Sequence, residues 1–143
     1  MPRGDRRGKV IVVHSIEQAR AAVAAAAALG VPVTLASGPG AGAYLGPLWF
    51  RELIDLAADG FPEVAVEAVL DCGDRPGLVL AALQAGLKQV RFSGSRAMAA
   101  RLGEIAAARG ARVITRRLAG LDLLDRPDLE AACHAWLSSG KPL

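Results

Sequence analysis

The chain has few aromatic residues and few cysteines. Aromatic residues make up 4% of its 143 residues, whereas 52% are hydrophobic, so alanine, valine and leucine must build the core. Two cysteines, Cys72 and Cys133, are too few for a disulfide framework, which favours a reduced, cytoplasmic protein. The length is that of one domain with a sizeable core, and we expect a single domain over residues 1–143.

Long apolar runs and a strong net charge are also absent. No run reaches the roughly 18 residues that a membrane span requires. The net charge is only +3, and the arginines late in the chain have no interleaved aromatics. This pattern favours a solvated face over a nucleic-acid surface. The basic residues at the start of the chain precede no apolar signal segment, and we expect a flexible basic arm over residues 1–8.

Apolar, β-branched runs alternate with helical patterns along the whole chain. The runs predict strands at 10–13, 31–36, 64–70, 90–92 and 113–115. Between and after them the pattern predicts helices at about 15–29, 47–58, 74–86, 95–109 and 125–137. Ser15 and Gln18 have the spacing of a capping box, and Gly30 is the expected stop of the first helix.

Five strand-helix units predict an α/β domain whose five-stranded parallel sheet carries helices on both faces. Two architectures remain open. The sheet is either doubly wound and open, or half of a (β/α)8 barrel whose inner wall is covered in an oligomer. We favour the open sheet, because a bare half-barrel leaves apolar surface wet at a cost of about 25 cal/mol per Å².

Polar residues follow several predicted strands, where parallel sheets bind their ligands. Asp71 ends an apolar strand, where a carboxylate needs a partner, and it is the candidate catalytic residue. The candidate ligand-binding residues are Ser37, Gly38, Gly40, Gly42, Asp74, Ser93, Gly94, Ser95 and His14.

Each candidate also has a purely structural interpretation. The glycine-rich loop after the second strand is either an anion-binding loop or a flexible turn. Ser95 and Asp74 stand where helix caps are expected. His14 ends the first strand and can be satisfied locally. Cys72 fits a small buried hydrophobe better than a metal ligand or a nucleophile.

The motifs, in this order, resemble the first half of the class II fructose-bisphosphate aldolases over roughly residues 9–120. Ser15-Ile16-Glu17-Gln18 resembles the family's N-L-E-Q helix start, and residues 32–41 resemble its P-V-I-L-Q-x-S-x-G-A strand and loop. Residues 69–73 resemble H-L-D-H-G, and residues 85–95 resemble A-G-F-x-S-V-M-x-D-G-S. Tyr44 matches the tyrosine that often follows the strand and loop of residues 32–41 in the family. These five pieces in order make the resemblance more specific than any one of them.

The resemblance implies a (β/α)8 barrel, with a general acid/base at Asp71. It also implies a zinc ligand at Cys72, where the family has histidine, and Val69 stands where the family has another histidine. The family's remaining metal ligands and phosphate-binding loops have no counterpart in this sequence. One ligand does not hold a zinc ion, so we expect no bound zinc and no aldolase activity. Cys72 is the single candidate ligand.

Two hypotheses from different functional classes follow. In the first, the chain binds a small anionic, phosphate-bearing ligand over Ser37–Gly42, Asp71 and Ser93–Ser95. In the second, it is an oligomeric scaffold or interaction module without a ligand, with Trp49 and Phe50 as candidate anchors of the contact. Both include a homo-oligomer, and neither requires a membrane or a nucleic acid. Whether the chain is an enzyme stays open.

Overall fold

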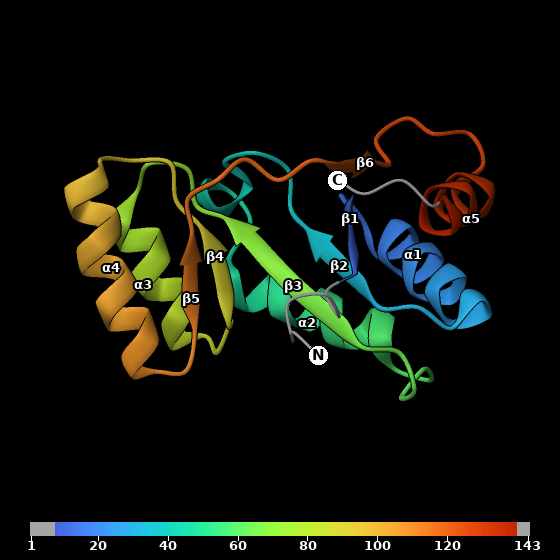
Figure 1. Cartoon of the computed structure of the whole chain (residues 1–143), viewed down its shortest axis with the longest axis horizontal. Helices are drawn as coiled ribbons and strands as arrows, with labels where there is room; N and C mark the ends of the chain where they lie inside the picture. Colours follow the sequence, from blue (N-terminus) through green and yellow to red (C-terminus); the bar gives the residue numbers. More distant parts are fainter. Residues whose placement is uncertain (1–7, 140–143) are drawn as a thin grey trace. The chain divides into compact units, whose positions relative to one another are not determined.

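The computed structural model describes residues 8–139, so the predicted basic arm lies outside the described residues except for Gly8. Within this range, strands alternate with helices along the chain (Figure 1). The strands are β1 (Lys9–Val12), β2 (Val33–Ala36), β3 (Val66–Asp71), β4 (Gln89–Arg91), β5 (Arg112–Ile114) and β6 (Gly120–Asp122). The α-helices are α1 (Ile16–Leu29), α2 (Pro47–Ala58), α3 (Pro76–Gln84), α4 (Arg96–Ala108) and α5 (Leu129–Ser138), and a short 3₁₀ turn η2 covers Ala41–Ala43.

The described strands form one six-stranded sheet in the order β5-β4-β3-β2-β1-β6. The pairings of β1 with β2 and β6, and of β4 with β3 and β5, are parallel. The predicted parallel α/β fold is therefore confirmed, but the predicted count of five strands is wrong. The missed strand, β6, has three residues, of which only Leu121 is apolar, so no hydrophobic run marks it in the sequence.

The strand order also overturns the preference for a doubly wound sheet with helices on both faces. From β1 to β5 each strand is added on the same side of its predecessor. With right-handed crossovers this order places the intervening helices on one face, as in a (β/α)8 barrel. β6 lies on the other side of β1, but residues 115–119 before it contain no helix. The connection to β6 therefore places no helix on the second face of the sheet, as a doubly wound fold would require. The half-barrel alternative fits the strand order.

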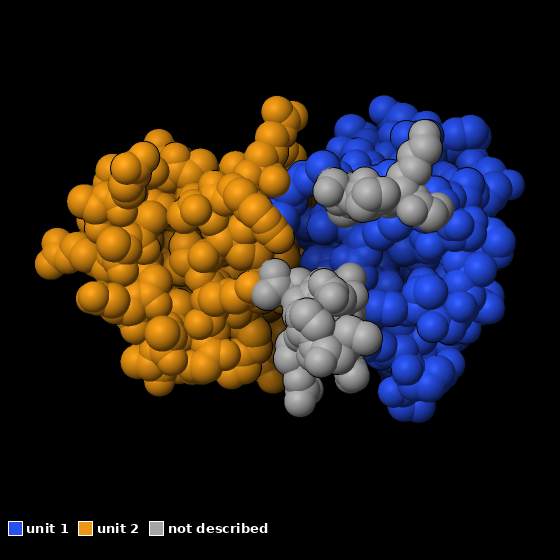
Figure 2. Space-filling model, in the orientation of Figure 1, with its two compact units in different colours: residues 1–36, 53–67, 118–143 blue, residues 37–52, 68–117 orange. Residues whose placement is uncertain are grey.

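The chain divides into two compact units, coloured separately in Figure 2. Unit 1 comprises residues 1–36, 53–67 and 118–143. In its described part α1 packs against α5. The Ser15 hydroxyl accepts a hydrogen bond from the N–H of Gln18, and Gly30 ends α1 in the left-handed conformation; this confirms the Gly30 stop and the Ser15 half of the predicted capping box. The Gln18 side chain, however, accepts from the N–H of His14 and not from that of Ser15.

Unit 2 comprises residues 37–52 and 68–117. Helices α3 and α4 pack against each other, α3 contacts β4, and α4 contacts β5. Leu70 and Val90 are paired across β3 and β4 and are fully buried. Asp71 and Arg91, one residue further along each strand, are also paired. Because side chains alternate along a strand, they lie on the opposite face from Leu70 and Val90.

No helix within residues 8–139 is both long enough and apolar enough to cross a membrane. The longest of them, α1, has 14 residues, fewer than the roughly 20 that a bilayer requires.

Candidate functional site

Asp71, at the carboxyl end of β3, is held by three hydrogen bonds within unit 2. Its Oδ1 accepts from the backbone N–H of Gly40 at 3.0 Å and of Gly73 at 2.9 Å. Its Oδ2 accepts from Nη1 of Arg91 at 3.0 Å. The residue is 7% exposed. The carboxylate therefore has the partners that its position requires, and they come from the loop after β2, the loop after β3 and strand β4.

The glycine-rich loop after β2 faces Asp71 rather than solvent. The Ser37 hydroxyl accepts from the N–H of Asp71 at 2.8 Å and is buried. The N–H of Gly40, which the sequence suggested for phosphate binding, donates to the Asp71 carboxylate. Gly38 and Gly42 are buried, and a Cβ atom at Gly42 would lie 2.9 Å from the carbonyl oxygen of Asp71. Asp71 thus occupies the place where an external anion would meet this loop.

The segment Ser93–Ser95 lies at the start of α4 and is better placed for an external ligand. The N–H of Ser93 donates to the carbonyl oxygen of Gly73 at 2.8 Å, which joins the exits of β3 and β4. Ser95 is the predicted N-cap, and its hydroxyl accepts from the N–H of Met98. Ser93 and Ser95 are exposed. In residues 8–139 no group accepts from the N–H of Gly94 or Ser95, so these donors remain open to an anion.

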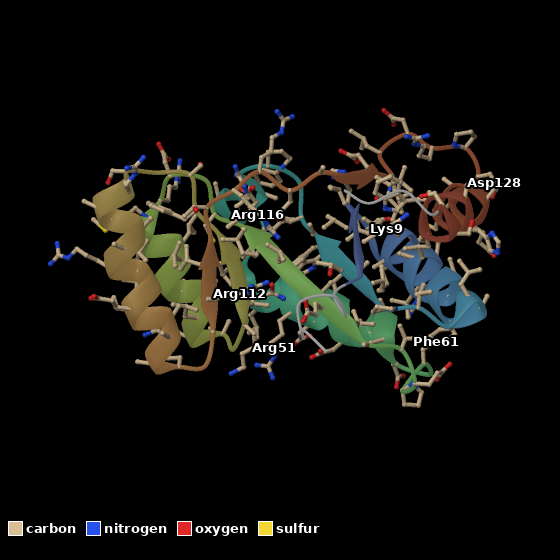
Figure 3. The ribbon with its side chains drawn as sticks, in the orientation of Figure 1. Lys9, Arg51, Phe61, Arg112, Arg116 and Asp128 are labelled. Atoms are coloured by element: carbon tan, nitrogen blue, oxygen red, sulfur yellow. The ribbon has the colours of Figure 1, made fainter. Side chains whose placement is uncertain are left out.

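Arginines surround the exits of the three strands of unit 2. Arg91 donates through Nε to the carbonyl oxygen of Arg116 at 3.0 Å, which fixes the backbone after β5. Figure 3 shows Arg116 beyond the carboxyl end of this strand. The arginines of these exit segments are Arg75, Arg91, Arg96, Arg116 and Arg117. Against them stand only Asp71 and Asp74, which leaves three positive charges. We call the exit segments 71–75, 91–96 and 115–117 the basic rim of unit 2.

Cys72 does not fit the zinc ligand that the aldolase resemblance implies. It is 1% exposed. Burial first, and then the charge of Asp71, raises the pKa of its thiol from 9.0 to about 12, so the free thiol is protonated at neutral pH. In the described part of the chain, no three side chains of His, Cys, Asp or Glu lie close enough to share a metal ion. The donor set therefore does not fit a catalytic zinc, which takes three protein ligands.

Asp74 and His14 take no part in the hydrogen bonds of Asp71. Asp74 is exposed, but the N-cap of α3 is Arg75, which makes no side-chain cap bond; the prediction of a cap at Asp74 is wrong. His14 belongs to unit 1 and follows β1. Its Nε2 lies 2.7 Å from Oδ1 of Asp122 at the end of β6.

The sequence interpretation missed Arg91, Arg116 and Asp122. Arg91 interrupts the apolar run of its strand, and this interruption was the available signal for an inward-facing partner of Asp71. Arg116 directly follows β5, at the sheet edge where ligands bind. Asp122 gave no signal, because β6 itself was not predicted.

The chain matches no protein-family model. Among curated proteins it is similar to the fructose-bisphosphate aldolase of Xanthobacter flavus, with 35% identity over 83 residues, 58% of this chain and 23% of that protein. The fructose-bisphosphate aldolase of Pseudomonas aeruginosa is 34% identical over 83 residues, again 58% of this chain and 23% of that protein. The chain therefore spans about a quarter of the length of these relatives.

A solved structure shows the same fold over part of its length. It is the crystal structure of a candidate fructose-1,6-bisphosphate aldolase from Coccidioides immitis, with a TM-score of 0.58 and 22% identity. The match covers 77% of this chain and 41% of the other. The resemblance found in the motifs is confirmed: over part of its length, this chain is similar to fructose-bisphosphate aldolases.

Proposed function

We propose that the chain binds a small anionic, phosphate-bearing ligand at the basic rim of unit 2. The observation that carries this proposal is the pair of open N–H groups at Gly94 and Ser95 beside the arginines of the rim. Free amides at a helix start favour an anion through both hydrogen bonds and the helix dipole. Guanidinium groups add charge-assisted hydrogen bonds that suit phosphate oxygens.

The hydrogen-bond partners of Asp71 limit where an anionic ligand can bind. Its carboxylate already takes the amides of Gly40 and Gly73 and one nitrogen of Arg91. A second anion at that position would meet the negative charge of Asp71, which already accepts from the amides of Gly40 and Gly73. The ligand therefore binds over Ser93–Ser95, Arg96 and Arg116, while Asp71 holds the loops below it in place.

The similarity to aldolases supports a sugar phosphate as the ligand class. The curated relatives are named fructose-bisphosphate aldolases, but this chain spans only a quarter of their length. The donor set around Cys72 does not fit zinc, and both oxygens of Asp71 are engaged. We therefore propose binding without aldol cleavage by this chain alone.

Calorimetric titration with inorganic phosphate tests the proposal, at constant ionic strength and with chloride as the competing anion. Arg116→Gln removes one guanidinium and keeps the carbonyl that Arg91 uses. We expect it to weaken binding roughly tenfold, because a hydrogen bond to a charged group contributes about 1.5–3 kcal/mol. The matched control is Arg101→Gln, at an exposed position within α4, which should leave the affinity unchanged. No binding at millimolar phosphate, or equal loss in both variants, would refute the proposal.

The alternative is an oligomeric scaffold, and one observation favours it. Tyr44, Leu48 and Trp49 are 76%, 57% and 50% exposed in one short stretch of unit 2, an apolar surface of the kind that binds partners. Trp49 keeps the predicted role of an anchor, whereas Phe50 is 1% exposed and belongs to the core. Sedimentation of the wild type and of Trp49→Gln at micromolar concentration tests this alternative. An oligomer that Trp49→Gln dissociates supports the scaffold, and a wild-type monomer contradicts it.

A further inference from the structure

The second cluster of chemistry-bearing residues lies in unit 1, at the exits of β1 and β6. These strands are parallel neighbours, with Val12 paired to Asp122. His14 follows β1 by two residues, and its Nε2 lies 2.7 Å from Oδ1 of Asp122. The two side chains are 29% and 49% exposed. The pair is therefore firmly hydrogen-bonded and also open to solvent.

The bonds around the pair fix its orientation. Oδ1 of Asp122 also accepts from the N–H of Leu124 at 2.9 Å. The N–H of His14 donates to the Gln18 side chain at 2.7 Å, and the Gln18 amide donates to the carbonyl oxygen of Leu123 at 3.2 Å. Gln18 thus ties the backbone of His14 to the segment that follows β6. Each member of the pair therefore has a second hydrogen bond besides the one between the two side chains: Asp122 with the N–H of Leu124, and the backbone of His14 with Gln18.

The hydrogen bond to Asp122 determines which nitrogen of His14 is reactive. An ionised carboxylate accepts a proton-bearing nitrogen, so the neutral ring carries its proton on Nε2. Partial burial raises the pKa of Asp122, but the N–H of Leu124, the hydrogen bond and charge of His14 and the charge of Arg126 together lower it. Asp122 is therefore ionised at neutral pH. Among the described residues, none bonds to Nδ1 of His14, whose lone pair stays available.

We propose that His14 and Asp122 form a nucleophilic dyad, with Nδ1 of His14 as the attacking nitrogen and a small ester or thioester as the class of substrate. A carboxylate that orients an imidazole and stabilises its cation is the arrangement of acyl-transfer sites. Ile16 and Glu17, in the first turn of α1, carry N–H groups without intrahelical acceptors. These donors lie two and three residues after His14 in the chain, and in the proposal they stabilise the developing oxyanion. The dyad is independent of phosphate binding in unit 2.

The reaction balances without a further reagent. Nδ1 attacks the acyl carbon, the bond to the leaving alkoxide or thiolate breaks, and the acyl-imidazole cation is stabilised by Asp122. Water then attacks the acyl carbon and the acyl–Nδ1 bond breaks, which releases the carboxylate product and regenerates the Nε2–H form of His14. Of the two protons that water supplies, one passes to the alkoxide or thiolate and the other to solvent.

The hydrolysis of p-nitrophenyl acetate tests the dyad, because the chain supplies its own control. The only other histidine, His134, is exposed on α5 and has no carboxylate partner among the described residues. We expect His14→Gln to remove most of the protein-dependent release of p-nitrophenolate, and His134→Gln to leave it unchanged. Asp122→Asn should lower the rate about tenfold or more, because an amide neither fixes the tautomer nor stabilises the imidazole cation as a carboxylate does. Equal rates in the wild type and His14→Gln, or an equal loss in His134→Gln, would overturn the proposal.

Imidazole nitrogen NMR at neutral pH gives a readout that a purely structural pair would not change. The proposal predicts the Nε2–H tautomer for His14 in the wild type and a mixture of tautomers in Asp122→Asn. A backbone amide spectrum of each variant confirms that it is folded. An Nδ1–H tautomer in the wild type would contradict the dyad, whatever the esterase rates.

Discussion

Nη1 of Arg91 lies 3.0 Å from Oδ2 of Asp71, while its Nε donates to the carbonyl oxygen of Arg116. One guanidinium therefore joins the exits of β3, β4 and β5 in unit 2. Asp71 extends the same network to Gly40 and Gly73. The carboxylate that the aldolase resemblance assigned to catalysis has, in this chain, the bonds of a structural anchor.

Asp71→Ala should lower the free energy of unfolding by about 3 kcal/mol, because it leaves the partly buried Arg91 and two amides without their acceptor. Urea unfolding followed by circular dichroism measures the change. The matched control is Asp74→Ala, three residues away and exposed, which should stay within about 0.5 kcal/mol of the wild type. Equal effects of the two substitutions would show that the network does not stabilise the fold.

Gly94→Ala should destabilise the protein by about 1–3 kcal/mol. A Cβ atom there would lie 2.3 Å from Cζ of Phe92, whose ring is 1% exposed. By contrast, Gly103→Ala, in the middle of α4 with nothing within 4 Å, should stabilise it by up to about 1 kcal/mol. Thermal unfolding of the two variants tests whether their changes in stability have opposite signs. Gly94 is consequently a poor position for separating ligand binding from folding.

Both cysteines should be unreactive in the folded protein. Burial, with the charge of Asp71, raises the pKa of Cys72 to about 12; burial, with the charge of Glu130, raises that of Cys133 to about 11. The thiolate, which is the reactive form, is then scarce at pH 8. An aromatic disulfide reagent should label neither thiol under native conditions and both in guanidinium chloride. Rapid native labelling would contradict the burial of the labelled cysteine.

Asp122 should stabilise the folded protein at neutral pH and lose this contribution at acidic pH. Its pKa is lowered from 3.8 in the folded protein, so the folded state holds its proton less tightly than the unfolded chain does. The contribution is complete above pH 3.8 and is lost as the pH falls through the lower, folded-state pKa. Urea unfolding between pH 2 and 6 should show a shallower acid loss for Asp122→Asn than for the wild type. Identical slopes would place the pKa of Asp122 at its ordinary value.

Much of the fold follows from the sequence because its signals are local. Ser15 and Ser95 each cap the helix predicted to begin there, since a hydroxyl before an apolar pattern satisfies free N–H groups. The last helix begins at Leu129, after its N-cap Asp128, and not at residue 125 as predicted. β6 escaped prediction because Gly120–Asp122 depends on pairing with β1 and not on a local apolar run. The strand order escaped for a related reason: periodicity identifies strands but does not say which strands become neighbours.

The sequence predicted where the residues of the candidate site lie in the fold, but not which groups form hydrogen bonds with Asp71. Asp71 and Ser93–Ser95 follow the strands that the sequence indicated, and parallel strands end at one edge. That Asp71 is satisfied by Arg91 and by the amide of Gly40 depends on the register of β3, β4 and the loop after β2. No local pattern specifies this register.

Amide NMR during a titration with inorganic phosphate tests the central claim most directly, because it reports where the anion binds. We predict that the amides of Gly94, Ser95 and Arg96 shift first and saturate together at millimolar phosphate, while those of Gly40 and Gly73, bonded to Asp71, move little. Chloride at equal ionic strength should leave all of them in place. If the first signals to move belong to other segments, or if none moves, the basic rim of unit 2 does not bind the ligand and the claim is wrong.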